Sequence, residues 1–156
     1  MSGWSAALNP SAEATARPAP AMTVPALQQL LIEVCAAWVQ DLGLRVTAAQ
    51  GSEVTLALPV ATRLVHGGGV LCGQALMAAA DTAMVLAVSH QLGGFRPMTT
   101  VQLQTSFLRP VAGDSGELTL VARVLRAGKS LVFGEIEIFD ATGRLAAHAT
   151  TTYALL

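Results

Sequence analysis

The chain has 156 residues, the length of a single domain. It is 53% hydrophobic and 12% charged with a net charge of −1, so it lacks the positive charge expected for binding nucleic acid or an anionic membrane. So many apolar residues with so few charges favour oligomerisation, which covers apolar surface. We therefore expect a homo-oligomer with no nucleic-acid partner and no membrane partner.

The first 22 residues are rich in Ala, Ser and Pro and show no apolar periodicity. They lack an apolar run of signal-peptide length after a basic start, so we expect residues 1–22 to form a disordered tail and residues 23–156 to form the domain. The two cysteines, Cys35 and Cys72, lie in apolar helix-like segments, and no Cys/His spacing typical of a metal site occurs. This pattern predicts free thiols, no bound metal and a cytoplasmic location.

The first predicted element is a helix over residues 24–43, because Thr23 supplies a hydroxyl cap and apolar residues follow at helical spacing. Residues 44–60 alternate around a Gln-Gly-Ser turn, which is typical of a β-hairpin. Residues 59–69 form a loop that ends in three glycines, and residues 71–92 form a second, longer helix closed by two glycines.

The second helix is apolar on nearly all sides, so it should be buried on nearly all sides. Strand-like runs separated by turn residues follow it and supply the cover; they span residues 98–111, 116–127, 130–140 and 144–156. This order predicts an α+β fold in which an antiparallel β-sheet wraps around a long central α-helix. Such a sheet has open edges, so pairing between subunits through an edge strand is expected.

A single charged residue, Asp81, interrupts the second helix. It is the only Asp, Glu, Lys or Arg from Val65 through Gly94. A buried charge without a partner costs several kcal/mol, and a charge in lipid is similarly unfavourable, which argues against a membrane span in this apolar run. Asp81 must therefore be exposed, be paired, or take part in chemistry.

The segment "HGGGVLCGQALMAAADTAM", followed by "TTVQLQTSFLRPV", resembles the hot-dog superfamily. The closer resemblance is to acyl-CoA thioesterases of the phenylacetate-degradation type, and it covers about residues 25–156. It implies the hot-dog fold, hydrolysis of an acyl-CoA thioester, a homodimer or a tetramer of two dimers, and no cofactor beyond the CoA of the substrate. Related members often carry His-Gly-Gly before the helix, with the His nine positions before the acid; Cys72 occupies that position here.

The resemblance implies that Asp81 is a nucleophile or a general base, two roles that the sequence does not separate. The thioester carbonyl also needs a hydrogen-bond donor, and Gly73 at the start of the helix offers a free N–H. The two residues are eight positions apart, about 12 Å along a helix. One carbonyl cannot easily reach both in one chain, so we expect two antiparallel central helices in a dimer, with Gly73 of one chain facing Asp81 of the other.

Several further residues are candidates for assisting roles. In similar thioesterases the loop position of His66 holds the substrate or the attacking water, and a Ser or Thr near Thr100 positions the water or the acid. Candidates for contact with CoA or the acyl chain are Arg109, Lys129, Ser130, Met77 and Met84. Each also has an ordinary structural interpretation as a loop, strand, surface or core residue.

Two other functions fit parts of the pattern. A hydratase or dehydratase of the same fold pairs a His with an acid, and His66 lies fifteen positions before Asp81, but the His-Phe-Pro pattern of those enzymes is missing. A non-catalytic protein that binds acyl groups or CoA is the other alternative, because a fold does not dictate a function. An acid in the helix centre favours an enzyme, since a binding protein could use an apolar residue there.

Overall fold

The computed structural model describes residues 21–156, so the predicted tail lies almost wholly outside the described residues. The chain forms, in order, α1 (Val24–Val34), α2 (Ala37–Gln40), β1 (Arg45–Gln50), β2 (Glu53–Pro59), a short 3-10 turn (Thr62–Leu64), α3 (Gly73–Leu92), β3 (Met98–Phe107), β4 (Glu117–Ala127), β5 (Leu131–Phe139) and β6 (Leu145–Leu155).

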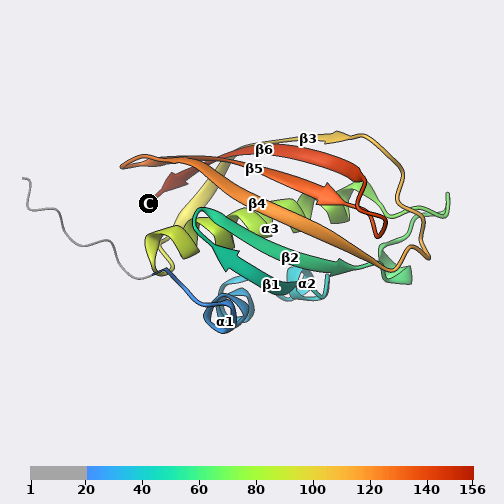
Figure 1. The fold of residues 1–156 in the computed structure, drawn as a ribbon, viewed down its shortest axis with the longest axis horizontal. Helices are drawn as coiled ribbons and strands as arrows, with labels where there is room; N and C mark the ends of the chain where they lie inside the picture. The colour runs from blue at the N-terminus through green and yellow to red at the C-terminus, as the bar shows by residue number, and fades with distance from the viewer. Residues whose placement is uncertain (1–20) are drawn as a thin grey trace, which may run out of the picture.

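The strands form one antiparallel sheet in the order β1-β2-β4-β5-β6-β3. Figure 1 shows this sheet curving along α3, with α1 near the end of the sheet that carries β1. The predicted α+β fold, an antiparallel sheet around a long central helix, is confirmed. The strands at the two ends of the order, β1 and β3, each pair with one neighbour, so β3 is an edge strand beside β6.

The first predicted helix is divided into two, which the sequence pattern did not indicate. Cys35 and Ala36 both adopt extended backbone conformations between α1 and α2. The side-chain amide of Gln40 donates to the main-chain oxygens of Ile32 (2.9 Å) and Cys35 (2.8 Å). These bonds satisfy carbonyl groups that the end of α1 leaves without helical partners, which stabilises the break.

The central helix begins at Gly73, two residues later than expected. Leu71 is held in extended conformation, because it bridges Val65 and its N–H donates to the main-chain oxygen of Val111 at 2.9 Å. Cys72 then acts as the N-terminal cap residue, and Gly93 closes the helix with a φ of 74°, a conformation that glycine adopts readily.

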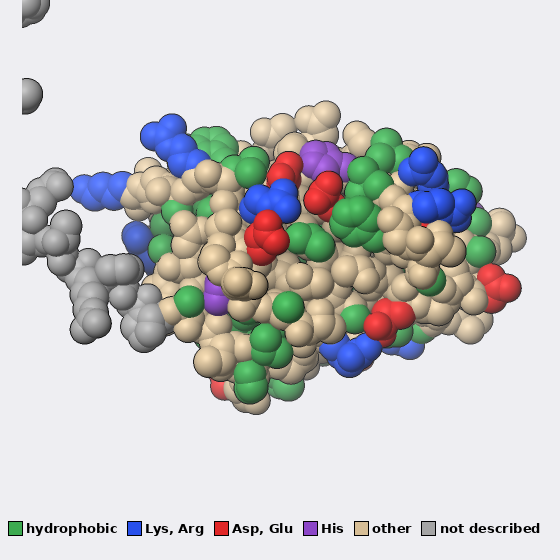
Figure 2. All heavy atoms as spheres, viewed as in Figure 1, with side chains coloured by type: hydrophobic (Ala, Val, Ile, Leu, Met, Phe, Trp, Pro, Cys, Tyr) green, Lys and Arg blue, Asp and Glu red, His purple; other side chains and the backbone are tan. Residues whose placement is uncertain are grey.

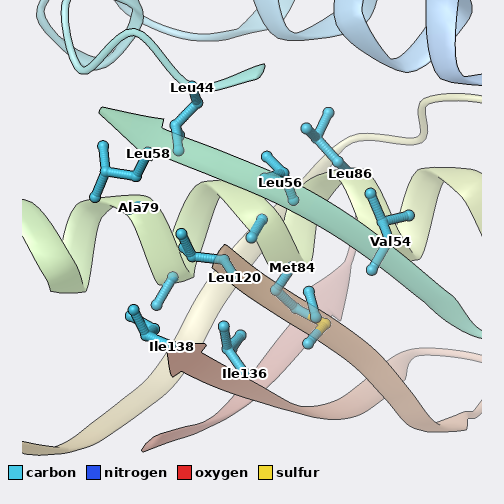
Figure 3. Close-up of a cluster of buried hydrophobic side chains, with 14 of the residues drawn as sticks. Leu44, Val54, Leu56, Leu58, Ala79, Met84, Leu86, Leu120, Ile136 and Ile138 are labelled. Atoms are coloured by element: carbon cyan, nitrogen blue, oxygen red, sulfur yellow. The ribbon is translucent and has the colours of Figure 1, made fainter. Parts of the chain in front are cut away.

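The core lies between α3 and the sheet. Figure 3 shows Met84 and Leu86 of the helix among Leu56, Leu120 and Ile136 of the strands, and all five side chains are fully buried. Met84 packs against Gly134 of β5, where any added Cβ would collide with its Sδ and Cε atoms. The expectation that Met84 lines a substrate pocket is therefore wrong, because its side chain fills the space next to the sheet.

Helix α3 is also long and apolar enough to cross a membrane by length and composition. In its most apolar window, however, 67% of the residues are buried inside the fold. Helix α3 is thus covered by the sheet of its own chain, as is typical of a helix in the core of a protein.

The outer face of the sheet carries charges of both signs. Arg123 of β4 bonds to Glu53 and Glu135, at 2.6 Å each, and His148 lies 3.4 Å from Glu135. The bond from Arg123 lowers the pKa of Glu135 below its usual value. Figure 2 shows acidic and basic side chains lying next to one another on the face in view, so that face has no large region of a single charge.

Candidate functional site

One stripe of α3 is not covered by the sheet. Its residues follow helical spacing, with Gln74 and Met77 exposed and Ala78, Asp81 and Val85 half-buried. The remaining face of the helix is buried in the core. Asp81 therefore points away from the core, which explains how the otherwise apolar helix accommodates a carboxylate.

The carboxylate of Asp81 is held by two hydroxyl groups from the sheet. Thr100 of β3 donates its Oγ1 hydrogen to Oδ1 at 2.9 Å. The hydroxyl of Tyr153 on β6 also lies within hydrogen-bond distance of Oδ1, and it is 2.9 Å from the main-chain oxygen of Asp81. The expected neighbourhood of Thr100 and Asp81 is thus present in the structure.

Tyr153 contacts the candidate residue Asp81, and the sequence interpretation missed it. Its side chain is buried, and burial, followed by the nearby charge of Asp81, raises its pKa well above the ordinary value. Tyr153 is therefore a protonated donor at neutral pH. Burial and the same carboxylate also raise the pKa of Cys35, so that thiol is neutral as well. The available signal was that the only tyrosine in the chain occupies an inward position of the last strand.

A second group of residues surrounds the start of α3. Gly73 is the first helical residue, and no acceptor for its N–H is found in residues 21–156. A Cβ at Gly73 would lie 3.0 Å from the ring of Phe107. Gly73, Phe107 and Arg109 line a pocket of about 300 Å³ together with Leu76. A free N–H beside a pocket suits a carbonyl oxygen that gains negative charge.

Within one protomer these two groups lie apart. Asp81 lies eight positions after Gly73, about 12 Å along the helix. On the neighbouring strand β3, Thr100 lies near one end and Phe107 at the other. The acid and the helix N-terminus are therefore too far apart to act on one carbonyl group of one substrate within a single chain.

His66 lies on the loop before α3 and is exposed. Its ring Nδ1 accepts from the main-chain N–H of Gly68 at 2.9 Å, and the main-chain N–H of His66 donates to the main-chain oxygen of Val70 at 3.0 Å. In the described part of the chain it makes no hydrogen bond with Asp81. The pairing of a His with the acid that a hydratase requires is thus not formed within the protomer.

Two other candidates for CoA contact, Lys129 and Ser130, lie near the start of β3, at the end opposite to Arg109. Lys129 and Ser130 are exposed on the β4–β5 turn, where they line a hollow with Arg126. The main-chain oxygen of Ser130 accepts from Leu155, which pairs with Met98 at the start of β3. Arg109 instead follows the end of β3, so one protomer does not bring Arg109 and Lys129 together.

Comparison with known proteins gives a consistent family assignment. Residues 65–147 match the family model of the thioesterase superfamily. A candidate esterase of Thermoplasma volcanium is 30% identical over 111 residues, which cover 66% of this chain and 75% of that protein.

Solved structures show the same fold. A thioesterase of Haemophilus influenzae is 26% identical, with a TM-score of 0.77 over 86% of this chain and 91% of the other. The PaaI protein from the phenylacetic acid degradation operon of Escherichia coli superposes with a TM-score of 0.71 at 23% identity, covering 83% of this chain and 91% of that one. The family match, the relatives and the shared hot-dog fold lead to one conclusion: the chain belongs to the thioesterase superfamily and is a hydrolase.

Proposed function

We propose that this protein hydrolyses an acyl-CoA thioester to the free acid and CoA, at a site shared by two protomers, and that it belongs to the phenylacetate-degradation type within its superfamily. The observation that carries the proposal is the carboxylate of Asp81. It lies on the uncovered stripe of a buried helix and is held by Thr100 and Tyr153. A carboxylate in that setting suits attack on a thioester or activation of water.

The proposed dimer follows from the distance between the two groups. If the α3 helices of two protomers run antiparallel with Gly73 opposite the partner's Asp81, the twofold axis passes beside Met77, midway between them. If β3 pairs antiparallel with the partner's β3 and the axis passes beside Leu103 or Gln104, it again lies midway between the two groups, here between Thr100 and Phe107. Both elements thus place the axis midway between the two groups of site residues.

The exposed apolar side chains support this interface. Val101 and Phe107 on the edge strand are 60% and 51% exposed, and Met77 on the uncovered stripe is 36% exposed. Large apolar groups on an open strand edge favour association. Pairing through β3 covers these side chains and encloses Asp81 in a cleft between subunits. In a tetramer, two such dimers would associate through surfaces other than β3 and the uncovered stripe of α3.

In this site the N–H of Gly73 from one protomer donates to the thioester oxygen, which gains charge as the carbonyl carbon is attacked. Asp81 of the other protomer attacks that carbon to form an anhydride that water then hydrolyses, or removes a proton from the water that attacks. In either route the bond from carbon to sulfur breaks, and the thiolate of CoA leaves and takes up a proton.

The remaining candidates surround this cleft. An antiparallel pair of β3 strands brings Arg109 of one protomer toward Lys129 and Ser130 of the partner, where they contact the phosphates or the pantetheine arm of CoA. His66 holds the substrate or the water, and Met77 borders the acyl group. The reaction uses no cofactor beyond the CoA of its substrate, and a cytoplasmic location supplies such thioesters.

The test is release of free thiol from a panel of short, medium, long-chain and aromatic acyl-CoA esters. We expect hydrolysis of at least one class by the wild-type dimer. If a folded dimer binds CoA but releases no thiol from any ester, the alternative of a non-catalytic binding protein replaces this proposal.

A further inference from the structure

The two hydroxyl groups on Asp81 come from a single cross-strand pair. Thr100 of β3 lies opposite Tyr153 of β6 in the antiparallel ladder. Residues directly opposite one another in a ladder point to the same face of the sheet, here toward α3. The irregular pairing between Thr100 and Gln102 changes the register directly after this pair. The sheet therefore places both hydroxyl donors beside the same residue of the helix, Asp81.

Both donors reach the same carboxylate oxygen. Oδ1 of Asp81 lies within hydrogen-bond distance of both hydroxyls, whereas Oδ2 has no hydrogen-bond partner among residues 21–156. The Tyr153 side chain is 1% exposed, so its hydroxyl cannot turn to solvent. A buried hydroxyl needs a partner, and Asp81 supplies acceptors in its side chain and its main chain.

We propose that Tyr153 is a positioning residue: together with Thr100 it holds Oδ1 of Asp81, so that Oδ2 is the oxygen that acts on the substrate or on water. The catalytic part of this inference rests on the proposed function. The positioning part rests on the contacts alone, and the two parts are tested separately.

The side chains of Tyr153 on β6 and Cys35 after α1 both interact with Asp81, and Thr100 of β3 carries no charge. Tyr153 and Cys35 have pKa values above their usual range, so both are neutral at neutral pH. A change at the carboxylate of Asp81 should therefore be felt directly at the hydroxyl of Tyr153.

The chain contains one tyrosine, so biosynthetic incorporation of 3-fluorotyrosine labels Tyr153 and nothing else. This label keeps the hydroxyl of Tyr153. At neutral pH we expect the single ¹⁹F resonance of the wild type to lie at a different position from that of Asp81→Asn, because the variant replaces the carboxylate that the hydroxyl contacts. A resonance at the same position in both proteins overturns the positioning role without reference to activity.

The kinetic test is Tyr153→Phe, which removes the hydroxyl and keeps the ring. We expect kcat to fall about tenfold with KM unchanged within about twofold, since the substrate is still bound but the carboxylate is less well held. An unchanged kcat, or a loss that appears in KM instead of in kcat, contradicts the inference.

Thr151→Val is the matched control on the same strand. Thr151 is buried, and its hydroxyl donates to the main-chain oxygen of Gln102 at 2.8 Å, so this variant also removes a bond between β6 and β3. Among the described residues its hydroxyl makes no hydrogen bond with Asp81, so its kcat and KM should match those of wild type. If the wild type releases no thiol at all, the proposed function fails, while the ¹⁹F comparison still decides whether Tyr153 holds Asp81.

Discussion

Asp81→Ala should lower kcat for thioester hydrolysis by about 10³-fold, because it removes the group that we propose to attack the carbonyl carbon or to activate water. Asp81 lies on the uncovered stripe of α3 rather than in the core, so the fold should persist. The variant leaves the hydroxyl of Tyr153 with the main-chain oxygen of residue 81 as acceptor, which limits the loss of stability. The measurement is kcat on the best ester of the panel, with circular dichroism and light scattering on the same sample.

Asp114→Ala is the control for this variant, since Asp114 is exposed on the turn between β3 and β4, outside both groups of site residues. We expect wild-type turnover from it. Full turnover by Asp81→Ala would show that Asp81 takes no part in the reaction. Loss of folding or of the oligomer in Asp81→Ala would instead assign the carboxylate a structural role.

The second large effect is expected from Gly73→Pro, which removes the N–H that we assign to the thioester oxygen. Loss of one such donor lowers kcat by about 10²- to 10³-fold in other acyl-transfer enzymes. Proline suits this position, because Gly73 is the first residue of α3 and a helix tolerates proline there. The preceding residue, Cys72, already has the extended conformation that a following proline requires, with φ −70° and ψ 143°.

Gly73→Ala distinguishes the effect of losing the N–H from the effect of steric crowding beside residue 73. Its Cβ would lie 3.0 Å from the ring of Phe107, a side chain that is half exposed and can move. We expect Gly73→Ala to keep most of its turnover, since it keeps the N–H. Equal losses in the alanine and proline variants would show that space beside Gly73, and not its N–H, limits the reaction.

The fold was predictable because its signals are local. Apolar spacing placed the helices, alternation placed the strands, and glycine-containing turns such as Gly51-Ser52 placed the ends. The break at Cys35 was not predictable, because it depends on Gln40 reaching back to carbonyl groups that a longer helix would have paired. The late start of α3 depends on a bridge between Leu71 and Val65, and single-sequence patterns do not show such pairings.

The site was only partly predictable. A lone carboxylate in an apolar helix makes Asp81 a candidate directly, and Thr100 lies near the start of the next strand. Tyr153 contacts Asp81 only because β6 pairs with β3 in one register, which no local pattern indicates. Met84 was one candidate for contact with the acyl chain, with a core position as the alternative, and its buried side chain packs against Gly134 and the sheet.

The central claim is that two protomers share each site, and mixing two inactive variants tests it most directly. Asp81→Ala and Gly73→Pro are unfolded together and refolded, so that about half of the dimers are mixed. A mixed dimer then has one site with both wild-type groups and one site with neither. The account predicts that activity returns to about a quarter of the wild-type value. If each site lies within one protomer, every site in the mixture lacks one group, and no recovery of activity would contradict the account.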